Sequence, residues 1–395
     1  MLEGKRIAYI CADPGVPVYG QKGCSVHVQE IVREFGRQGA SVDLICQRKG
    51  GEKPAGFNHV TLHRLPKVKH KSGANREQQL IEANHFIRDL LGKLPEPDLV
   101  YERYSLWSRD ALSWAKSNGI HSFLEVNAPL IEEQKKHREL YNVNEAREIE
   151  QSAFHFASTL IAVSNEVANY IHTVVNDKNV LVLPNGVRVE RFNHGKALRA
   201  EDTFTVGFVG TLKPWHGVNT LIESIKLIHE KIPELRLLLV GDGPERASLE
   251  EDVCDANLDN IVEFTGLVDP SDIPENLSKM DVAVAPYPVL EGFYFSPLKV
   301  YEYMAAFVPV IASNIGQLAG LIKDYENGLL IQPGNAEDLA DKIIELYQSS
   351  ALRTSIANSA YELILEQHTW KAVVDSLLNQ FEEPMPDGMN SVHAQ

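Results

Sequence analysis

The chain lacks the features of membrane-spanning and disulfide-bonded proteins. Its 395 residues include no run of 18 uninterrupted apolar residues, so the sequence predicts no transmembrane helix. The first residues lead directly into a strand-like segment at 7–12, without the apolar region of a signal peptide. The four cysteines, Cys11, Cys24, Cys46 and Cys254, form no CxxC pair. We therefore expect a cytoplasmic protein with free thiols.

Several catalytic patterns are missing as well. The 14 histidines show no HExxH spacing, and there is no Asp-x-Asp pair to hold a divalent ion on a diphosphate. A GxSxG elbow and a GxxxxGK[ST] loop are both absent, which disfavours a serine hydrolase and a P-loop ATPase. We expect no metal site and no cofactor.

Positive charge is scarce in the second half of the chain. Residues 1–190 carry 24 Lys and Arg against 23 Asp and Glu, whereas the remainder carries 14 against 31. This imbalance argues against general nucleic-acid binding. Two basic stretches, 67–71 and 135–138, suggest an anionic acceptor or peripheral contact with the inner membrane surface. Solvated loop and helix faces are the interpretation that such short charge runs favour.

What the chain does contain is a regular alternation of short apolar runs and helical patterns, which is typical of doubly wound α/β domains. Strands are predicted at 7–12, 42–46, 99–102, 123–126, 160–163 and 180–183, and then at 205–209, 237–240, 261–264, 282–285, 310–312 and 329–331. Helices are predicted at 25–38, 220–232, 336–348 and 370–381. Two such series predict two Rossmann-like domains, 1–188 and 203–368, facing across a cleft, with a polar linker between them. A C-terminal helix at 369–384 and a disordered tail at 385–395 complete the predicted organisation.

The most informative segment is the start of a predicted helix near residue 296. Ser296 is a typical N-cap residue, and Pro297 suits the first helical position. The free N–H groups and positive dipole end of a helix bind anions. Glu302 follows six residues later, roughly 9 Å along the axis at ~1.5 Å per residue. An anion-binding helix start with a carboxylate at this distance suits a nucleotide-sugar.

Three turns that follow predicted strands of the second series are further candidates. Gly210 ends a strand, and Lys213 and His216 follow it as groups that would neutralise a diphosphate. Gly241 opens a second glycine-containing turn, which lacks a complete GxGxxG motif. The third turn contains Gly266 and Val268, whose backbone groups would meet a base edge. Ordinary strand–helix turns explain each of these patterns equally well.

In the first domain, polar residues also follow predicted strands. Gly23 lies in the first strand–helix turn and leaves room for a diphosphate or an acceptor. Asn127 follows the strand that contains Glu125, so both are expected at the carboxyl edge of the sheet. Glu102 and Arg103 end another strand, and we expect them to form an internal ion pair.

Together these segments resemble the retaining glycosyltransferases of the GT-B fold, family four (glycosyl transferases group 1), over roughly residues 5–380. The resemblance is most specific in the second domain, at 210–217, 241–244, 264–266, 295–313 and 326–334. It implies that this domain binds the nucleotide-sugar and that the first domain binds the acceptor. Glu302 matches the second glutamate of the E-x7-E motif, which binds the ribose. Ser296, Pro297 and Leu298 match the helix start at the diphosphate, and Gly23 matches the glycine loop that closes on the donor.

The chain departs from this family pattern at the sugar and at the diphosphate. Tyr294 replaces the first glutamate of E-x7-E, and Glu291 is the alternative group that would reach the sugar from the loop. The family's diphosphate-binding Arg and Lys fall at Thr211 and His216. We expect Lys213 and Lys299 to supply the positive charge instead. Phe307 also stands where the family usually has glycine.

The resemblance implies transfer of a hexosyl group from a nucleoside-diphosphate sugar to an acceptor hydroxyl, with retention of the anomeric configuration and no metal ion. Lys213 and Lys299 are expected to stabilise the leaving diphosphate, with Asn127 closest to the sugar. The acceptor is a glycan, a glycolipid or a small molecule. Two alternatives remain open, a nucleotide-sugar epimerase or hydrolase and a non-catalytic sensor of nucleotide-sugars or glycans.

Overall fold

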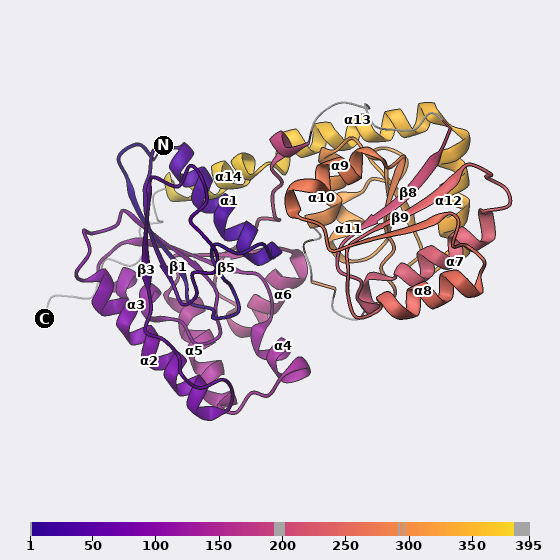
Figure 1. The fold of residues 1–395 in the computed structure, drawn as a ribbon. Coiled ribbons are helices and arrows are strands. Elements are labelled where there is room, and N and C mark those ends of the chain that lie inside the picture. The colour runs from indigo at the N-terminus through magenta and orange to yellow at the C-terminus, as the bar shows by residue number, and fades with distance from the viewer. Residues whose placement is uncertain (1, 193–201, 291–292, 295, 297, 383–395) are drawn as a thin grey trace, which may run out of the picture. The chain divides into compact units, whose positions relative to one another are not determined.

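The computed structural model describes residues 2–192, 202–290, 293, 294, 296 and 298–382. These residues form two compact α/β units, each built on one parallel sheet (Figure 1). Unit 1 contains the residues up to Ala162, Tyr170–Leu183 and the helix α14 (Trp370–Glu382). Unit 2 contains Val163–Asn169 and Pro184–Thr369. Two parallel-sheet units confirm the predicted α/β class. Glu291, Pro297 and the predicted tail 385–395 lie outside the described residues.

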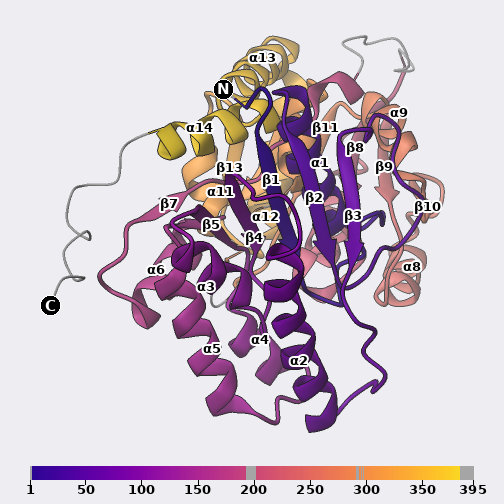
Figure 2. The ribbon, with the colours of Figure 1, turned by 90° about the vertical axis from the view of Figure 1, so that its left-hand side faces the viewer.

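Unit 1 contains a sheet of order β3-β2-β1-β4-β5-β6-β7, in which all neighbours run parallel. Figure 2 shows β1, β2 and β3 side by side. The strands are β1 (Arg6–Cys11), β2 (Ser41–Cys46), β3 (Val60–Arg64), β4 (Leu99–Arg103), β5 (His121–Val126), β6 (Thr159–Ala162) and β7 (Val180–Val182). The helices are α1 (Gly23–Arg37), α2 (Ala74–Leu91), α3 (Asp110–Ser117), α4 (Leu130–His137), α5 (Val143–Phe156) and α6 (Asn165–Val174), the last of which is divided between the units.

Unit 2 contains a sheet of order β10-β9-β8-β11-β12-β13, again parallel throughout. Its strands are β8 (Phe204–Val209), β9 (Leu235–Val240), β10 (Val262–Gly266), β11 (Val282–Ala285), β12 (Val310–Ser313) and β13 (Leu329–Ile331). Its helices are α7 (Val218–Ile228), α8 (Arg246–Asp255), α9 (Ile273–Ser278), α10 (Leu298–Ala305), α11 (Gly316–Leu321), α12 (Ala336–Gln348) and α13 (Ser350–Gln367). Short 3-10 turns are η1 (Val189–Arg191), η2 (Pro214–His216) and η3 (Pro270–Asp272).

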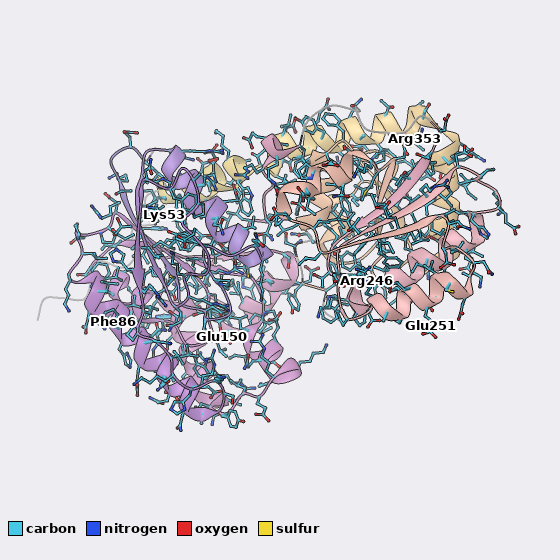
Figure 3. All side chains as sticks on the ribbon, viewed as in Figure 1. Lys53, Phe86, Glu150, Arg246, Glu251 and Arg353 are labelled. Carbon is cyan, nitrogen blue, oxygen red and sulfur yellow. The ribbon has the colours of Figure 1, made fainter. Side chains whose placement is uncertain are left out.

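Both faces of the unit 2 sheet are covered, and the strands are therefore apolar on both sides. On one face, Val206, Phe208 and Leu239 pack with residues of α7, α8 and α12. On the other face, Val209 and Val240 pack with residues of α10, α11 and α13. The Arg353 side chain of α13 is labelled in Figure 3, and its Cζ lies 5.5 Å from the Phe204 ring centroid. Its guanidinium donates to carbonyl groups at the end of α12. Among the described residues, no helix is long and apolar enough to cross a membrane.

The predicted strands are confirmed to within two residues at each end. The prediction missed β3, an edge strand whose only fully buried residue is Val60. An edge strand with one buried side chain shows no apolar run, so its sequence does not predict a strand. The pairing of β3 with β2 is set by backbone hydrogen bonds that composition does not reveal.

The unit boundaries differ from the predicted domain limits at three places. Pro184 and the residues after it belong to unit 2, where the Val187 N–H donates to the His368 carbonyl oxygen at 2.8 Å. Helix α14 belongs to unit 1, where the Trp370 ring lies 5.0 Å from the His27 ring. The segment Val163–Asn169 belongs to unit 2, because Gln317 Nε2 donates to the Val163 carbonyl oxygen at 2.8 Å.

Each sheet has one topological switch point, where the strand order reverses. In unit 1 it lies between β1 and β4, and in unit 2 between β8 and β11. Ligands of open parallel sheets bind beyond the carboxyl ends of the strands at this point. The turns after β1, β4, β8 and β11 are therefore the expected places for a ligand.

Phe307 has an unusual backbone conformation at the end of α10. Its φ of 56° is left-handed, a region in which a bulky residue is strained and glycine is not. The Val308 N–H donates to the Tyr303 carbonyl oxygen, which ends the helix as a glycine would. The Phe307 ring stacks on Tyr361 of α13, with centroids 3.9 Å apart and an interplanar angle of 24°. The stack holds α10 against α13 and offsets the strain.

We predict that Phe307→Ala is less stable than Phe307→Gly by about 1 kcal/mol, because both lose the stack but only glycine removes the strain. Urea denaturation of both variants and the parent measures the difference. Asn257, at φ 58°, is the matched control, since asparagine tolerates this conformation. Asn257→Gly should change the free energy of unfolding by less than about 0.5 kcal/mol. Equal stabilities of the two Phe307 variants would show that the backbone is unstrained.

Candidate active site

In unit 2, a lysine reaches the switch point between β8 and β11. Gly210 follows β8 directly, and Lys299 lies in the first turn of α10, which follows β11. A Cβ atom on Gly210 would lie 2.8 Å from Lys299 Nζ. Gly210 also has a φ of 151°, which residues with a side chain rarely adopt. The lysine reaches the strand end because residue 210 has no side chain.

The Lys299 ammonium is buried beside aromatic rings. Its Nζ lies 4.2 Å from the Phe208 ring centroid and 5.5 Å from that of Tyr287. Within the part of the chain that the structure describes, Nζ has no hydrogen-bond partner. Burial lowers the pKa of Lys299 to about 7, and the Glu302 carboxylate opposes this shift. A buried cation without a hydrogen-bonded partner is unfavourable and is a natural place for an anionic ligand.

Glu302 lies one turn further along α10 and pairs with Arg191. The Arg191 Nη1 lies 3.2 Å from the Glu302 Oε1, and Arg191 Nη2 donates to the Pro270 carbonyl oxygen. Burial raises the pKa of Glu302, although Arg191 and Lys299 act in the opposite direction. The carboxylate is thus held in place by an arginine that the sequence analysis missed. Arg191 lies in the polar stretch that was interpreted as a linker.

The glycine turns after β8, β9 and β10 lie against one another. A Cβ on Gly241 would lie 2.0 Å from the Gly210 carbonyl oxygen, and Gly241 has a φ of 135°. Gly241 also forms a bridge with Gly266, the last residue of β10. These three predicted residues therefore lie together at one edge of the sheet. The backbone of each turn packs directly against the backbone of the next. Val268 is partly buried against the core of unit 2.

The two other candidate cations of this edge differ in charge state and exposure. His216 Nδ1 donates to the Thr211 carbonyl oxygen. Burial and the nearby Lys299 lower the pKa of His216 to about 4, so it is neutral at pH 7. Lys213 is half-buried, with its Nζ 5.4 Å from the Trp215 ring centroid. Lys213 and Lys299 are the two lysines of this group.

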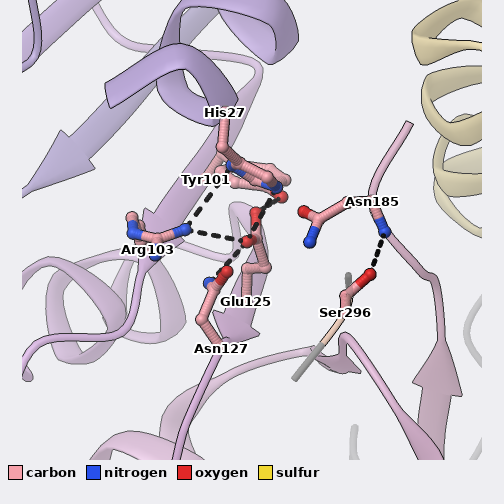
Figure 4. Close-up of polar contacts among 7 residues, drawn as sticks. All are labelled: His27, Tyr101, Arg103, Glu125, Asn127, Asn185 and Ser296. Carbon is pink, nitrogen blue, oxygen red and sulfur yellow. Dashed lines mark hydrogen bonds and ion pairs between the residues drawn. The ribbon is translucent and has the colours of Figure 1, made fainter. Parts of the chain in front are cut away.

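The residues that precede α10 make contacts within unit 2. Ser296 Oγ accepts a hydrogen bond from the Asn185 N–H at 3.2 Å, and the Leu298 N–H donates to the Ser296 carbonyl oxygen at 3.0 Å (Figure 4). The Tyr294 carbonyl oxygen accepts from Ser164 Oγ at 3.1 Å. Leu298 is the first residue of α10 and is half-buried.

In unit 1, a carboxylate cluster occupies the corresponding edge of the sheet. Glu125 Oε1 lies 3.1 Å from His27 Nε2 and 3.3 Å from Arg103 Nη1, and it accepts from Asn127 Nδ2 at 2.5 Å. The Tyr101 hydroxyl donates to Glu125 Oε2 (Figure 4). Burial alone would raise the pKa of Glu125, but these partners outweigh it and lower the pKa. Gly23 is exposed at the first residue of α1 in the same unit.

The predicted ion pair between Glu102 and Arg103 is wrong. Successive residues of a strand point to opposite faces, so these two side chains cannot meet. Arg103 pairs with Glu125 of the neighbouring strand. Glu102 is fully buried, and neither of its carboxyl oxygens accepts a hydrogen bond in the described structure. Burial raises the pKa of Glu102 to about 8. His27 was missed because a single histidine within an apolar helical pattern gives no signal.

No three His, Cys, Asp or Glu side chains among the described residues are grouped as metal ligands. Polar groups lie together at one place in each unit. Unit 2 has a buried cation with a nearby carboxylate, and unit 1 has a hydrogen-bonded carboxylate cluster. The first suits a ligand that carries both phosphate and hydroxyl groups. The second suits a ligand with hydroxyl groups.

The chain was compared with protein-family models, with curated proteins and with solved structures. The model of Glycosyltransferase Family 4 matches residues 22–191, and the model of Glycosyl transferases group 1 matches residues 189–363. An uncharacterized glycosyltransferase of Methanocaldococcus jannaschii is 30% identical over 235 residues, which cover 58% of this chain and 62% of that protein. A phosphatidyl-myo-inositol mannosyltransferase of Mycobacterium leprae is 26% identical over 52% of this chain and 54% of its own length. The chain thus spans about 54–62% of these curated relatives.

Solved structures resemble the chain over nearly its whole length. Sucrose-phosphate synthase of Thermosynechococcus elongatus matches with a TM-score of 0.74 and 21% identity, covering 95% of this chain and 98% of that one. HepE of Anabaena in complex with UDP matches with a TM-score of 0.70 and 18% identity, covering 95% and 99%. The TM-scores establish the fold, which is the GT-B fold. With both family models matched in succession, the chain belongs to the family-four glycosyltransferases, the glycosyl transferases of group 1.

Proposed function

We propose that the chain transfers a hexosyl group from a nucleoside-diphosphate sugar to an acceptor hydroxyl, with retention of configuration and without a metal ion or further cofactor. One observation carries the proposal: the buried Lys299 ammonium at the end of β8 has no hydrogen-bond partner in the described structure. A diphosphate supplies the missing anion. The ionised form of Lys299 is then favoured, and the charge that develops on the leaving group is stabilised.

Glu302 provides the second half of the donor site in this proposal. Its Oε1 is paired with Arg191, which leaves Oε2 to accept hydrogen bonds from ribose hydroxyls. The backbone of the Gly210, Gly241 and Gly266 turns permits close approach of the phosphates and the base. Structures of HepE were solved with UDP and with UDP-glucose, and their common fold supports a nucleotide-sugar as donor.

Unit 1 is proposed to bind the acceptor, with Asn127 beside the reacting sugar. A structure of TarM of Staphylococcus aureus holds UDP together with the glycan fondaparinux, which supports an acceptor of the glycan class. Glycolipids and small molecules are further members of the proposed acceptor class, in line with the basic stretches at 67–71 and 135–138. The cytoplasm and the inner membrane surface are the proposed locations.

Retention is proposed to proceed by front-face substitution. The leaving phosphate deprotonates the acceptor hydroxyl, and the anomeric carbon–oxygen bond forms on the face from which the diphosphate departs. Lys299 and Lys213 stabilise the negative charge on the departing diphosphate. This route needs no protein nucleophile.

The first prediction concerns the pH dependence of nucleotide binding. Lys299 is charged below its pKa of about 7 and neutral above it, whereas a bound diphosphate raises this pKa. Binding above pH 7 must therefore take up a proton, and the Kd should rise by up to about tenfold per pH unit. Calorimetric titration with UDP, GDP and ADP between pH 6 and 9, in buffers of different ionisation enthalpy, measures both effects.

Two variants control this experiment. Lys299→Arg keeps its charge at every pH tested, so its Kd should be nearly independent of pH above 7. Lys279→Met removes an exposed lysine that is paired with Glu275 and should leave the Kd within about twofold of the parent. Absence of binding by all three nucleotides, or an unchanged pH slope in Lys299→Arg, would refute the diphosphate site.

The second prediction concerns the ribose. Glu302→Ala should weaken binding of the ribonucleoside diphosphate by about 10- to 100-fold, the size of a hydrogen bond to a charged group. It should also abolish the preference for ribose over 2′-deoxyribose and 3′-deoxyribose nucleotides and remove most transfer activity. Competition binding with the deoxy analogues measures this. Thermal denaturation checks that the unpaired Arg191 leaves unit 2 folded. A variant that still discriminates the deoxy analogues would place the ribose elsewhere.

A further inference from the structure

The carboxylate cluster of unit 1 holds two side chains that reach the edge of the sheet. Glu125 is only 2% exposed, and its Oε1 is shared by His27, Arg103 and Asn127. The Tyr101 hydroxyl binds the other oxygen from the interior. A carboxylate with four partners is fixed in position, and it fixes those partners in turn.

Asn127 and Arg103 each use only part of their hydrogen-bonding capacity within this cluster. Asn127 donates through Nδ2, and its Oδ1 forms no hydrogen bond within the described residues. Arg103 uses Nη1, while its Nε and Nη2 have no partner there. Arg103 is the last residue of β4 and Asn127 follows β5, so both residues lie at the carboxyl edge of the sheet. Arg103 is 12% exposed and Asn127 is half-buried.

The charge of this edge is balanced. Burial lowers the pKa of His27 to about 4, despite the opposing Glu125, so His27 is neutral and donates from Nε2 to the carboxylate. The positive charge of Arg103 is matched by the negative charge of Glu125 at 3.3 Å. A site with paired charges attracts anions weakly and forms hydrogen bonds to hydroxyl groups equally well. Lys299 in unit 2 differs, because within the described residues its Nζ has no hydrogen-bonded partner.

We propose that Glu125 is a positioning residue for a neutral, hydroxyl-bearing sugar acceptor. It orients Asn127 so that Oδ1 accepts a hydrogen bond from one acceptor hydroxyl, and it orients Arg103 so that the free guanidinium edge donates to another. The inference rests on the proposed transferase function and assigns the acceptor contacts within unit 1. Arg103 ends β4 and His27 lies on α1, which follows β1, so the cluster borders the β1–β4 switch point, where ligands of parallel sheets bind.

Glu125→Gln tests the proposal, because it keeps the size of the side chain and removes its charge. The amide can no longer accept from His27, Arg103 and Asn127 together, and its own N–H groups must face one of these donors. Asn127 and Arg103 are then released from their fixed orientations. We expect acceptor kcat/KM to fall by about 10- to 100-fold, mainly through the acceptor KM, while the Kd for the nucleoside diphosphate is unchanged.

Asp43 of β2 offers a matched control. It is a buried carboxylate bonded to an arginine and a histidine, Arg6 Nη1 at 2.7 Å and His63 Nε2 at 2.8 Å. It lies in the first half of its strand, opposite Ala8 of β1, and thus away from the carboxyl edge. Asp43→Asn removes the same kind of charge pair and should lower the thermal midpoint without changing the acceptor KM.

Direct sugar binding provides a measurement that does not depend on turnover. Saturation-transfer NMR with methyl α-glucoside, methyl α-mannoside and glucuronate should show binding of a neutral sugar to the parent and to Asp43→Asn, and its loss in Glu125→Gln. Equal effects of the two substitutions, or stronger binding of glucuronate than of the neutral sugars, would overturn the proposal. If the chain is not a glycosyltransferase, the result is different from these two outcomes. The parent chain then binds no nucleoside diphosphate.

Discussion

The burial of one ammonium group at the end of β8 constrains much of unit 2. An amine that is removed from water favours its neutral form, and burial accordingly lowers the pKa of Lys299 to about 7. In the described part of the chain its Nζ has no hydrogen-bond partner. The position is reachable only because residue 210 is glycine, and Gly241 must then lie directly against the Gly210 backbone. The aromatic rings of Phe208 and Tyr287 stabilise the cation in part through their π faces. What the free protein lacks at this point is an anion.

The two units use the same topological position in opposite ways. In unit 1 the buried charges at the switch point are paired, and the Glu125 carboxylate is saturated with hydrogen bonds. A paired site is stable without a ligand and retains its geometry. In unit 2 the cation has no hydrogen-bonded partner among the residues that the structure describes, so part of the free energy of binding an anion comes from restoring its charge. The first arrangement favours orientation of a neutral ligand, and the second favours binding of a charged one.

The sequence predicts strands well here because buried parallel strands are continuous apolar runs, as in β8 and β9. It also predicts which glycines and which helix start lie at the carboxyl edge, because the positions of the turns follow from the alternation of elements. The edge strand β3 escapes this reasoning, since burial on one side leaves too short a pattern. Side-chain pairing escapes it for a different reason. Arg103 meets Glu125 on the next strand rather than its sequence neighbour Glu102, and Arg191 reaches Glu302 across 111 residues.

The departures from the family pattern are related to one another through charge. Thr211 and the neutral His216 stand where the resemblance places an arginine and a lysine, so Lys213 is the lysine that remains in the turn after β8. Lys299 lies on the other side of the switch point, on α10, and is buried rather than exposed. His216 is part of the same arrangement: a second positive charge there would repel Lys299, and the depressed pKa of the imidazole removes it.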